Sequence, residues 1–276
     1  MLRCTCWIAL CSAFGSIALS SDAQDDQETG GTSVADERAA ASEEASELLA
    51  ELTCHLDSAA TADVLPESVL NWSNPDVGRV YGDVFLWVEE GRPVAAASIY
   101  RWFHPYDSLT IEFSSMSGEQ VSVDQRDETI WHARDGGITW TALKNSRPPA
   151  SSRNLRLTQF KQIARRFSAE LVDARTDDDG VERTLRLLSQ PIYRYPESAC
   201  GADGAVFAMV IGTDPELLIV VESDERDWRY SVVRMNRDAL DVQIDDQRVV
   251  SFPHIADREL FDTTRPYCCI AVTYGE

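Results

Sequence analysis

Residues 204–222 read GAVFAMVIGTDPELLIVVE and predict a β-hairpin. Branched and aromatic side chains fill both arms, because such side chains fit a buried, pleated surface. Gly212, Asp214 and Pro215 interrupt the apolar run at the point where the chain must turn. This is the most strongly patterned stretch of the 276-residue chain, and it indicates an antiparallel sheet.

The same pattern occurs once more, 122 residues earlier. A shift without gaps matches five identical residues in nineteen positions: Gly82, Val84, Phe85, Val88 and Pro93 fall on Gly204, Val206, Phe207, Val210 and Pro215. Similarity at a fixed offset is the sequence signature of repeated units. We therefore expect an internal duplication in which Phe85 and Phe207 occupy corresponding inward positions.

Each of the two hairpins is preceded by a helical pattern. Apolar side chains at helical spacing predict one helix from Asp36 to Ser58 and another from Asn154 to about Val172. Short strand-like runs with Gly, Asp and Pro between them surround both hairpins, and they include Ile138–Leu143, Glu182–Tyr195 and Tyr267–Tyr274. The predicted fold class is α+β, with two similar halves that each consist of a helix and an antiparallel β-meander.

Composition divides the chain into five segments. We predict a signal peptide over residues 1–23, a disordered acidic segment over 24–35, a first helix-plus-meander half over 36–145, a linker over 146–152 and a second half over 153–276. The linker contains Pro148-Pro149. Whether the two halves form one domain or two is left open by the sequence.

The first 23 residues have the features of a secretory signal. Arg3 supplies a positive start, an apolar stretch runs from Trp7 to Leu19, and small side chains stand at Ser21 and Ala23. The apolar stretch is too short to span a bilayer comfortably, and no later segment approaches the ~20 apolar residues of a membrane helix. We expect an exported, soluble protein, periplasmic or extracellular, with no transmembrane segment after cleavage.

The charge of the chain excludes two classes of partner. It has 25 basic and 46 acidic residues, a net charge of −21. Nucleic-acid binding relies on clustered Lys and Arg that displace counterions, and anionic membranes attract the same residues. We therefore expect no nucleic acid and no membrane surface among its partners.

No residue spacing indicates a cofactor, a metal site or a catalytic motif. Cys54, Cys200, Cys268 and Cys269 remain after signal cleavage. Neighbouring strand residues point to opposite faces, so Cys268 and Cys269 should not bond to each other; the thiols are either buried and free, or Cys200 pairs with one of them. The acidic run Asp177–Gly180 predicts a turn, not a calcium loop, because arginines occupy the first and last ligand positions.

Aromatic side chains are the remaining candidates for a site. Aromatic and arginine side chains are frequent at recognition surfaces, since they combine large contact area with a polar group. Core and rim packing is the alternative role. The candidate ligand-binding residues lie at the ends of two predicted strands: Trp102, His104 and Tyr106, and Tyr193, Arg194 and Tyr195.

Several short stretches resemble a known family. They are Gly82–Trp87 with Gly91–Pro93, Leu185–Leu188 with Pro191–Tyr195, and Asp203–Gly204 with Gly212–Glu216. Together they are similar to a family of uncharacterised exported proteins of planctomycete bacteria, over roughly residues 70–235. The resemblance implies export and a shared fold, and it brings no catalytic residue.

Three functions are compatible with the sequence. A non-catalytic exported protein that binds an unidentified ligand or protein partner is the first expectation, because hairpins are abundant and no nucleophile with a positioned base is visible. The alternatives are a hydrolase with its site between the two halves and a structural component of the envelope. A triad can assemble from distant positions, so the missing motif does not exclude an enzyme.

Overall fold

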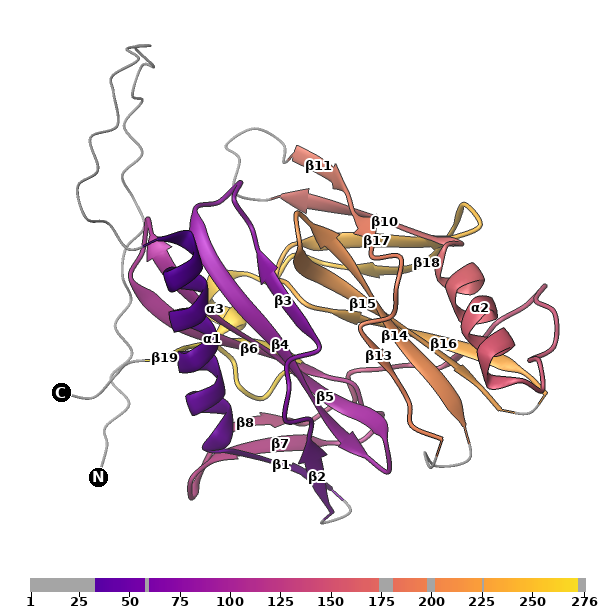
Figure 1. The fold of residues 1–276 in the computed structure, drawn as a ribbon, viewed down its shortest axis with the longest axis horizontal. Helices are drawn as coiled ribbons and strands as arrows, with labels where there is room; N and C mark the ends of the chain where they lie inside the picture. The colour runs from indigo at the N-terminus through magenta and orange to yellow at the C-terminus, as the bar shows by residue number, and fades with distance from the viewer. Residues whose placement is uncertain (1–32, 58–59, 174–180, 198–201, 225, 273–276) are drawn as a thin grey trace, which may run out of the picture. The chain divides into compact units, whose positions relative to one another are not determined.

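The computed structural model describes residues 33–57, 60–173, 181–197, 202–224 and 226–272, and residues 34–276 form one compact unit (Figure 1). The predicted signal peptide, nearly all of the predicted acidic segment, Cys200 and the run Asp177–Gly180 lie outside the described residues.

The described residues form three helices and nineteen strands. The helices are α1 (Val34–Ala50), α2 (Arg153–Ala164) and α3 (Asp257–Leu260). The strands are β1 (Leu52–Leu56), β2 (Thr61–Val64), β3 (Leu70–Ser73), β4 (Arg79–Glu89), β5 (Arg92–His104), β6 (Ser108–Ser115), β7 (Val121–Gln125), β8 (Glu128–Ala133), β9 (Thr141–Ala142), β10 (Phe167–Asp173), β11 (Val181–Thr184), β12 (Arg186–Leu187), β13 (Tyr193–Arg194), β14 (Asp203–Ile211), β15 (Asp214–Ser223), β16 (Trp228–Arg234), β17 (Ala239–Ile244), β18 (Gln247–Phe252) and β19 (Tyr267–Val272).

The strands form three sheets. The largest has the order β19-β6-β5-β4-β2-β1-β7-β8, with β3 also paired to β4. The second has the order β12-β14-β15-β16-β9, with β13 also on β14, and the third the order β11-β10-β17-β18. The pairs within them are antiparallel, as predicted. Strand is thus far more abundant than helix.

Both predicted hairpins are present, as β4–β5 and β14–β15. The central residues of their strands are buried on both faces and are mostly apolar, as a strand covered on both sides requires. In β14, Phe207 points into a core that α2 covers, while Val206 points into a central core shared with β4 and β5. In β4, Phe85 points into the core beneath α1, and Val84 into the same central core. The two hairpins therefore pack against each other through their inner faces.

Each helix covers the outer face of a hairpin. Helix α1 lies against β4 and β5, and α2 lies against β14 and β15 (Figure 1). Ala45, Leu48 and Leu49 of α1 and Phe160 and Ile163 of α2 are buried in these contacts. Further strands complete each outer core: β1, β7 and β8 beside α1, and β10 and β17 of the third sheet beside α2.

Both helices end earlier than the sequence predicts. Helix α1 stops at Ala50 instead of Ser58, and α2 stops at Ala164 instead of Val172. The residues after each helix are strands β1 and β10, in which alternate side chains are buried. Leu48, Leu49, Leu52 and Leu56 fit a helical stripe, but Leu52 and Leu56 also fit the two-residue period of a strand. Sheet pairing with β7 decides between the two for Leu52–Leu56.

Two further predicted strands are shorter than expected. Residues Glu182–Tyr195 form three pieces, β11, β12 and β13. The chain changes sheets between β11, which pairs with β10, and β12, which pairs with β14. Ser189, Gln190 and Pro191 separate β12 from β13, and proline has no N–H to donate to the ladder. Only Thr141 and Ala142 of Ile138–Leu143 form a strand, β9.

Strands β9 and β19 do not pair with the strands that precede them in the chain. Strand β9 follows β8 but pairs with β16, and β19 follows β18 but pairs with β6. The C-terminal strand thus completes the sheet that contains β4–β5, and β9 extends the sheet that contains β14–β15. This exchange ties the two layers of sheet together and has no signature in the sequence.

Candidate functional site

A row of polar side chains crosses three neighbouring strands, β5, β6 and β19. The register places Ser98 and Cys269 on either side of Glu112, and side chains directly opposite in a ladder share one face. Tyr100 lies two residues after Ser98 in β5, and Tyr267 lies two residues before Cys269 in β19. Both side chains are therefore on the same face as Glu112. Glu112 is therefore surrounded by two phenols, a hydroxyl and a thiol.

The second hairpin and its neighbour β16 cover this polar row. The hydroxyl of Ser114 donates to the carbonyl oxygen of Arg234 at 2.9 Å. The Arg234 guanidinium donates to three carbonyl oxygens, those of Asn236, Asp238 and Pro253, at 2.8–3.1 Å. It also lies between two rings, 5.5 Å from the centroid of Phe252 and 5.4 Å from that of Tyr267. We call Tyr100, Glu112, Glu216, Arg234, Tyr267 and Cys269 the junction cluster.

Glu112 is a carboxyl in the junction cluster that can exchange a proton near neutral pH. Partial removal from water, together with the negative charge of Glu216, raises the pKa of its carboxyl to about 7. The Tyr100 hydroxyl, which donates to Glu112 Oε1 at 2.9 Å, opposes this rise, as do Tyr267 and Arg234. Shifted carboxyl pKa values of this kind are frequent at functional sites.

The junction cluster holds no activated nucleophile. Burial raises the pKa of Cys269, Tyr100 and Tyr267 well above their ordinary values. Burial also raises the pKa of Cys54 and Cys268 to about 12. A thiol attacks as the thiolate, so these cysteines are inert at neutral pH. The cluster can bind or release a proton at Glu112, and it offers no covalent chemistry.

A completely buried acid, Glu222, lies beside the predicted residue Tyr195. Glu222 is completely buried and accepts hydrogen bonds from Arg92 at 2.8 Å and from the Tyr195 hydroxyl at 2.8 Å. Arg229 is the second arginine bound to the same carboxylate, and it stacks on Trp140, 4.4 Å from the ring centroid. Arg92 comes from the first hairpin and Glu222 from the second, so this cluster joins the two hairpins.

The predicted ligand residues lie in two groups. Trp102, His104 and Tyr106 stand at the end of β5, where Trp102 and Tyr106 meet edge to face with ring centroids 5.1 Å apart. His104 and Tyr106 are exposed. Tyr193, Arg194 and Tyr195 lie in and directly after β13. No hydrogen bond or ring contact between the two groups occurs in the part of the chain that the structure describes.

The three residues around β13 each have a defined contact. The Tyr193 hydroxyl donates to the Gly91 carbonyl oxygen at 3.0 Å, in the turn of the first hairpin. Arg194 donates to Asp203 at 2.7 Å, and Arg153 and Arg156 bind the same carboxylate. These contacts explain an aromatic and arginine-rich segment by packing and charge pairing. Of the three, Tyr193 and Arg194 are partly exposed.

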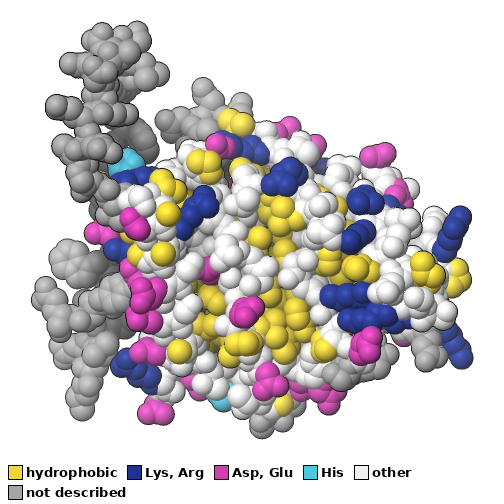
Figure 2. Space-filling model, in the orientation of Figure 1, with side chains coloured by type: hydrophobic (Ala, Val, Ile, Leu, Met, Phe, Trp, Pro, Cys, Tyr) yellow, Lys and Arg dark blue, Asp and Glu magenta, His cyan; other side chains and the backbone are white. Residues whose placement is uncertain are grey.

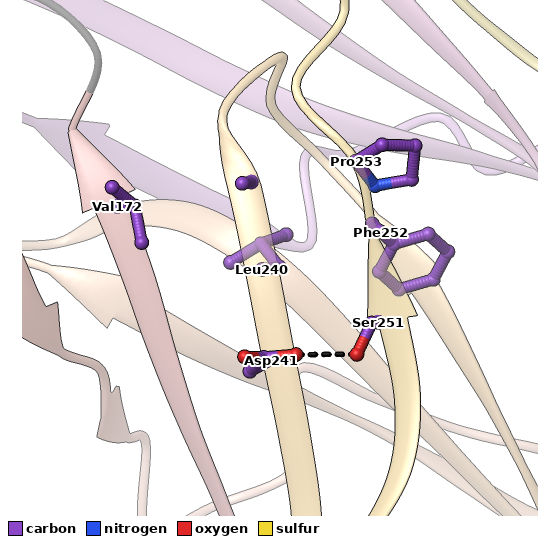
Figure 3. A pocket seen from close by; sticks show the side chains of 7 residues that line it. Val172, Leu240, Asp241, Ser251, Phe252 and Pro253 are labelled. Carbon is purple, nitrogen blue, oxygen red and sulfur yellow. Dashed lines mark hydrogen bonds between the residues drawn. The ribbon is translucent and has the colours of Figure 1, made fainter. Parts of the chain in front are cut away.

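A shallow cavity of about 390 Å³ lies on the sheet formed by β10, β17 and β18 (Figure 3). Its walls are mostly apolar, and they include Val172, Leu240, Phe252 and Pro253. The carboxylate among them, Asp241, accepts a hydrogen bond from Ser251, as Figure 3 shows, and lies 3.2 Å from Arg248. The cavity therefore presents no unpaired charge that would orient a polar ligand.

Neither a metal centre nor a membrane helix occurs in the described ranges. No group of three or more His, Cys, Asp or Glu side chains in these ranges could hold a metal ion. None of the helices among the same residues has the length and apolarity needed to cross a membrane. Cys54, Cys268 and Cys269 are free and buried, which confirms that Cys268 and Cys269 do not bond to each other.

Comparison with known proteins finds no family model, no curated protein and no solved structure that matches this chain. The resemblance to planctomycete exported proteins therefore stays a prediction.

Sequence reasoning missed the junction cluster. The stretch Leu109–Ser115 alternates apolar and polar residues, with Thr110, Glu112 and Ser114 on the polar face. Such alternation usually means that the polar face meets water. The available signal was Glu112 between Thr110 and Ser114 on one face of the strand. Only strand β16, which lies over that face, shows that these side chains belong to a cluster inside the fold.

Proposed function

We propose that the protein is an exported, non-catalytic binding protein that holds a protein partner on an apolar face between its two hairpins. The observation that carries this proposal is a surface on which hydrophobic side chains gather, in the middle of the face drawn in Figure 2. Scattered apolar residues are normal on a protein surface, whereas a contiguous apolar area is typical of an interaction site.

Two segments supply apolar side chains beside the central core. Leu65, Val69 and Leu70 belong to the segment from β2 to β3, and Leu188, Ile192 and Tyr193 to the segment from β12 to β13. All six are partly buried against the central core and keep part of their surface exposed. We call these six residues the apolar face. It includes Tyr193, one of the predicted ligand residues.

The two segments of the apolar face occupy equivalent positions. The Val69 N–H donates to the Val84 carbonyl oxygen, and the Ile192 N–H donates to the Val206 carbonyl oxygen, both at 2.8 Å. Val84 and Val206 are one of the five identical pairs in the match at an offset of 122 residues. This correspondence supports the further proposal that the chain consists of two related units.

Matching pairings throughout the two units support the duplication. Strand β1 pairs with β2 and β7, and β10 pairs with β11 and β17. The hairpins β4–β5 and β14–β15 share a register, including an irregularity after Trp87 and after Met209. A Cβ at Gly82 would meet the Trp72 ring, and one at Gly204 would meet the Tyr195 ring. A single event, the fusion of two copies, accounts for the matching strand pairings, the shared hairpin register and the two glycine–ring contacts.

A hydrolase remains the second candidate, because Glu112 lies between the hairpins with a pKa near 7. Such a carboxyl suits general acid–base catalysis. The raised thiol pKa values leave it without a covalent partner, so this hydrolase would have to activate water directly.

Site-specific photo-crosslinking tests the binding proposal. A benzophenone side chain is placed at Glu67 or at Gln190, exposed residues within the two segments of the apolar face. Matched controls carry it at Leu155 on α2 and at Phe261 beside α3, which are 60% and 53% exposed. We expect the same partner protein at Glu67 and Gln190 and none at the controls. Equal yields at all four positions, or no crosslink at Glu67 and Gln190, would contradict the proposal.

Export is tested separately. Mass spectrometry of the protein recovered outside the cytosol should find a new N-terminus near Gln24. Recovery of the intact chain from the cytosol would overturn export and leave the apolar face to be tested on its own.

A further inference from the structure

The outer hairpins β7–β8 and β17–β18 have the same register. Each ladder has one irregularity, after Val123 in β7 and after Val242 in β17. Trp131 of β8 lies opposite Val123, and Val250 of β18 lies opposite Val242. Both β8 and β18 are terminal strands of their sheets. Trp131 therefore corresponds to Val250, and each neighbour of Trp131 corresponds to a neighbour of Val250.

Residues 263–265 cover the free edge of β8. The His132 N–H donates to the Thr263 carbonyl oxygen at 2.8 Å, and the Trp131 indole donates to that of Arg265 at 2.9 Å. In an antiparallel ladder, the backbone groups of every second residue point away from the partner strand. His132 is such a residue of β8, and the covering segment gives its N–H a partner.

The corresponding edge of β18 has no covering segment among the described residues. Within these residues, β18 pairs with β17 alone, and no other backbone–backbone hydrogen bond of residues 247–252 occurs. Ser251 follows Val250 as His132 follows Trp131, so its N–H points away from the ladder. An outward row of N–H and C=O groups of this kind accepts another strand.

Side chains at this edge are also incompletely covered. Trp131 and Ala133 of β8 are fully buried, at 0% exposure, whereas Val250 and Phe252 at the equivalent positions of β18 stay partly exposed. The apolar cavity of about 390 Å³ borders the same edge, at Phe252 and Pro253 (Figure 3). The open edge of β18 therefore combines outward backbone groups with apolar surface.

The composition of this edge favours a second copy of the chain as its occupant. Residues 247–255 read QRVVSFPHI and contain no Asp or Glu, in a chain whose net charge is −21. The arginine of this run, Arg248, lies 3.2 Å from Asp241, so its charge is balanced within the chain. Acidic residues elsewhere repel a second copy, whereas two β18 strands meet without carboxylates of their own. Branched and aromatic residues at low net charge are also typical of strands that pair with identical strands.

We propose that β18 is a dimerisation edge, to which β18 of a second copy adds as an antiparallel strand. A twofold axis at Val250 places Val249 of each copy opposite Ser251 of the other, so that their outward N–H and C=O groups bond in pairs. The second copy then covers Val250 and Phe252, as residues 263–265 cover Trp131. The dimer uses none of the six residues of the apolar face, which stays free for another protein.

Sedimentation equilibrium of the full chain measures the dimer. At about 100 μM the parent protein should be dimeric, since an interface with a Kd of about 1 μM is almost fully occupied there. Ser251→Pro removes an outward N–H that takes no part in the β17 ladder, so it should give a monomer with unchanged circular dichroism. Val249→Lys places like charges beside the axis and should also give a monomer. Gln243→Lys adds the same charge on the inner strand β17 and should stay dimeric.

A disulfide bond tests the position of the axis. Val250→Cys should form a covalent dimer on mild oxidation, because strand residues that face each other across a twofold axis lie within disulfide reach. Leu155→Cys, on α2 and 60% exposed, is the matched control. It should form no more covalent dimer than the parent protein does, as non-reducing electrophoresis can show.

Three results would overturn the proposal. A parent protein that is monomeric at the same concentration would leave this edge to a strand of another protein. A dimer that persists in both Ser251→Pro and Val249→Lys would have to use another surface. Equal cross-linking of Val250→Cys and Leu155→Cys would reject the twofold axis on β18.

Discussion

Phe85 and Phe207 hold the same register position in two separate hairpins. Phe85 lies opposite Ala97, and Phe207 lies opposite Ile219. Each is followed by an irregularity two residues later, after Trp87 in β4 and after Met209 in β14. Each ring is almost completely buried, at 2% and 1% exposure, in the core beneath its own helix.

Truncating either phenylalanine should be severely destabilising. We expect Phe85→Ala and Phe207→Ala each to lower the free energy of unfolding by about 3–5 kcal/mol, because each leaves a cavity under a helix. Urea denaturation followed by circular dichroism measures the change. Phe261→Ala, at a ring that is 53% exposed, serves as the control and should cost about 0.5 kcal/mol or less. A small loss at only one of the two buried positions would contradict their equivalence.

Two glycines should be irreplaceable for the same reason in both hairpins. A Cβ at Gly82 would lie 2.5 Å from the Trp72 ring, and one at Gly204 would lie comparably close to the Tyr195 ring. We expect Gly82→Ala and Gly204→Ala to cost roughly 1–3 kcal/mol each through overpacking. Thermal unfolding compares them with Gly118→Ala, where a Cβ would meet no atom within 4 Å. Stability equal to that of the Gly118 variant would show that the rings can move aside.

Removal of the arginines that bind the completely buried Glu222 carboxylate should lower the free energy of unfolding more than removal of the carboxylate itself. Loss of both Arg92 and Arg229 strands a charge in the interior and should cost about 3–5 kcal/mol. Glu222→Gln instead leaves two partly exposed arginines that can turn to water, so it should cost less, about 1–3 kcal/mol. Denaturation of the two variants and of Arg248→Ala, from an exposed pair, measures the difference. A cost for Glu222→Gln above that of the double arginine variant would reject this ordering.

The buried cysteines should not react in the native state. With a pKa of about 12, the thiols of Cys54 and Cys268 are ionised in only about one molecule in ten thousand at about pH 8. Iodoacetamide should therefore label neither residue until guanidinium chloride unfolds the chain, as peptide mass spectrometry can follow. The same map under non-reducing conditions should contain no bond between Cys268 and Cys269. Rapid native labelling of either buried thiol would show that its strand opens easily.

The long hairpins could be predicted from the sequence, whereas the ends of the helices could not. Two runs of branched and aromatic residues around a Gly-containing turn have few other structures open to them. Leu52–Leu56 is different, because leucines four residues apart satisfy a helix and alternate residues satisfy a strand. The choice for these residues depends on β7, which lies far along the chain.

The candidate site shows the same division. The sequence by itself determined that Glu112 and Ser114 share one face of a strand and that Cys268 and Cys269 point apart, because the pleat alternates side chains. The tertiary structure alone decided that β16 covers that face, that β19 returns to pair with β6 and that Arg92 reaches Glu222. Periodicity records which side chains share a face. What covers the face depends on contacts between residues more than 100 positions apart, and those contacts leave no local pattern.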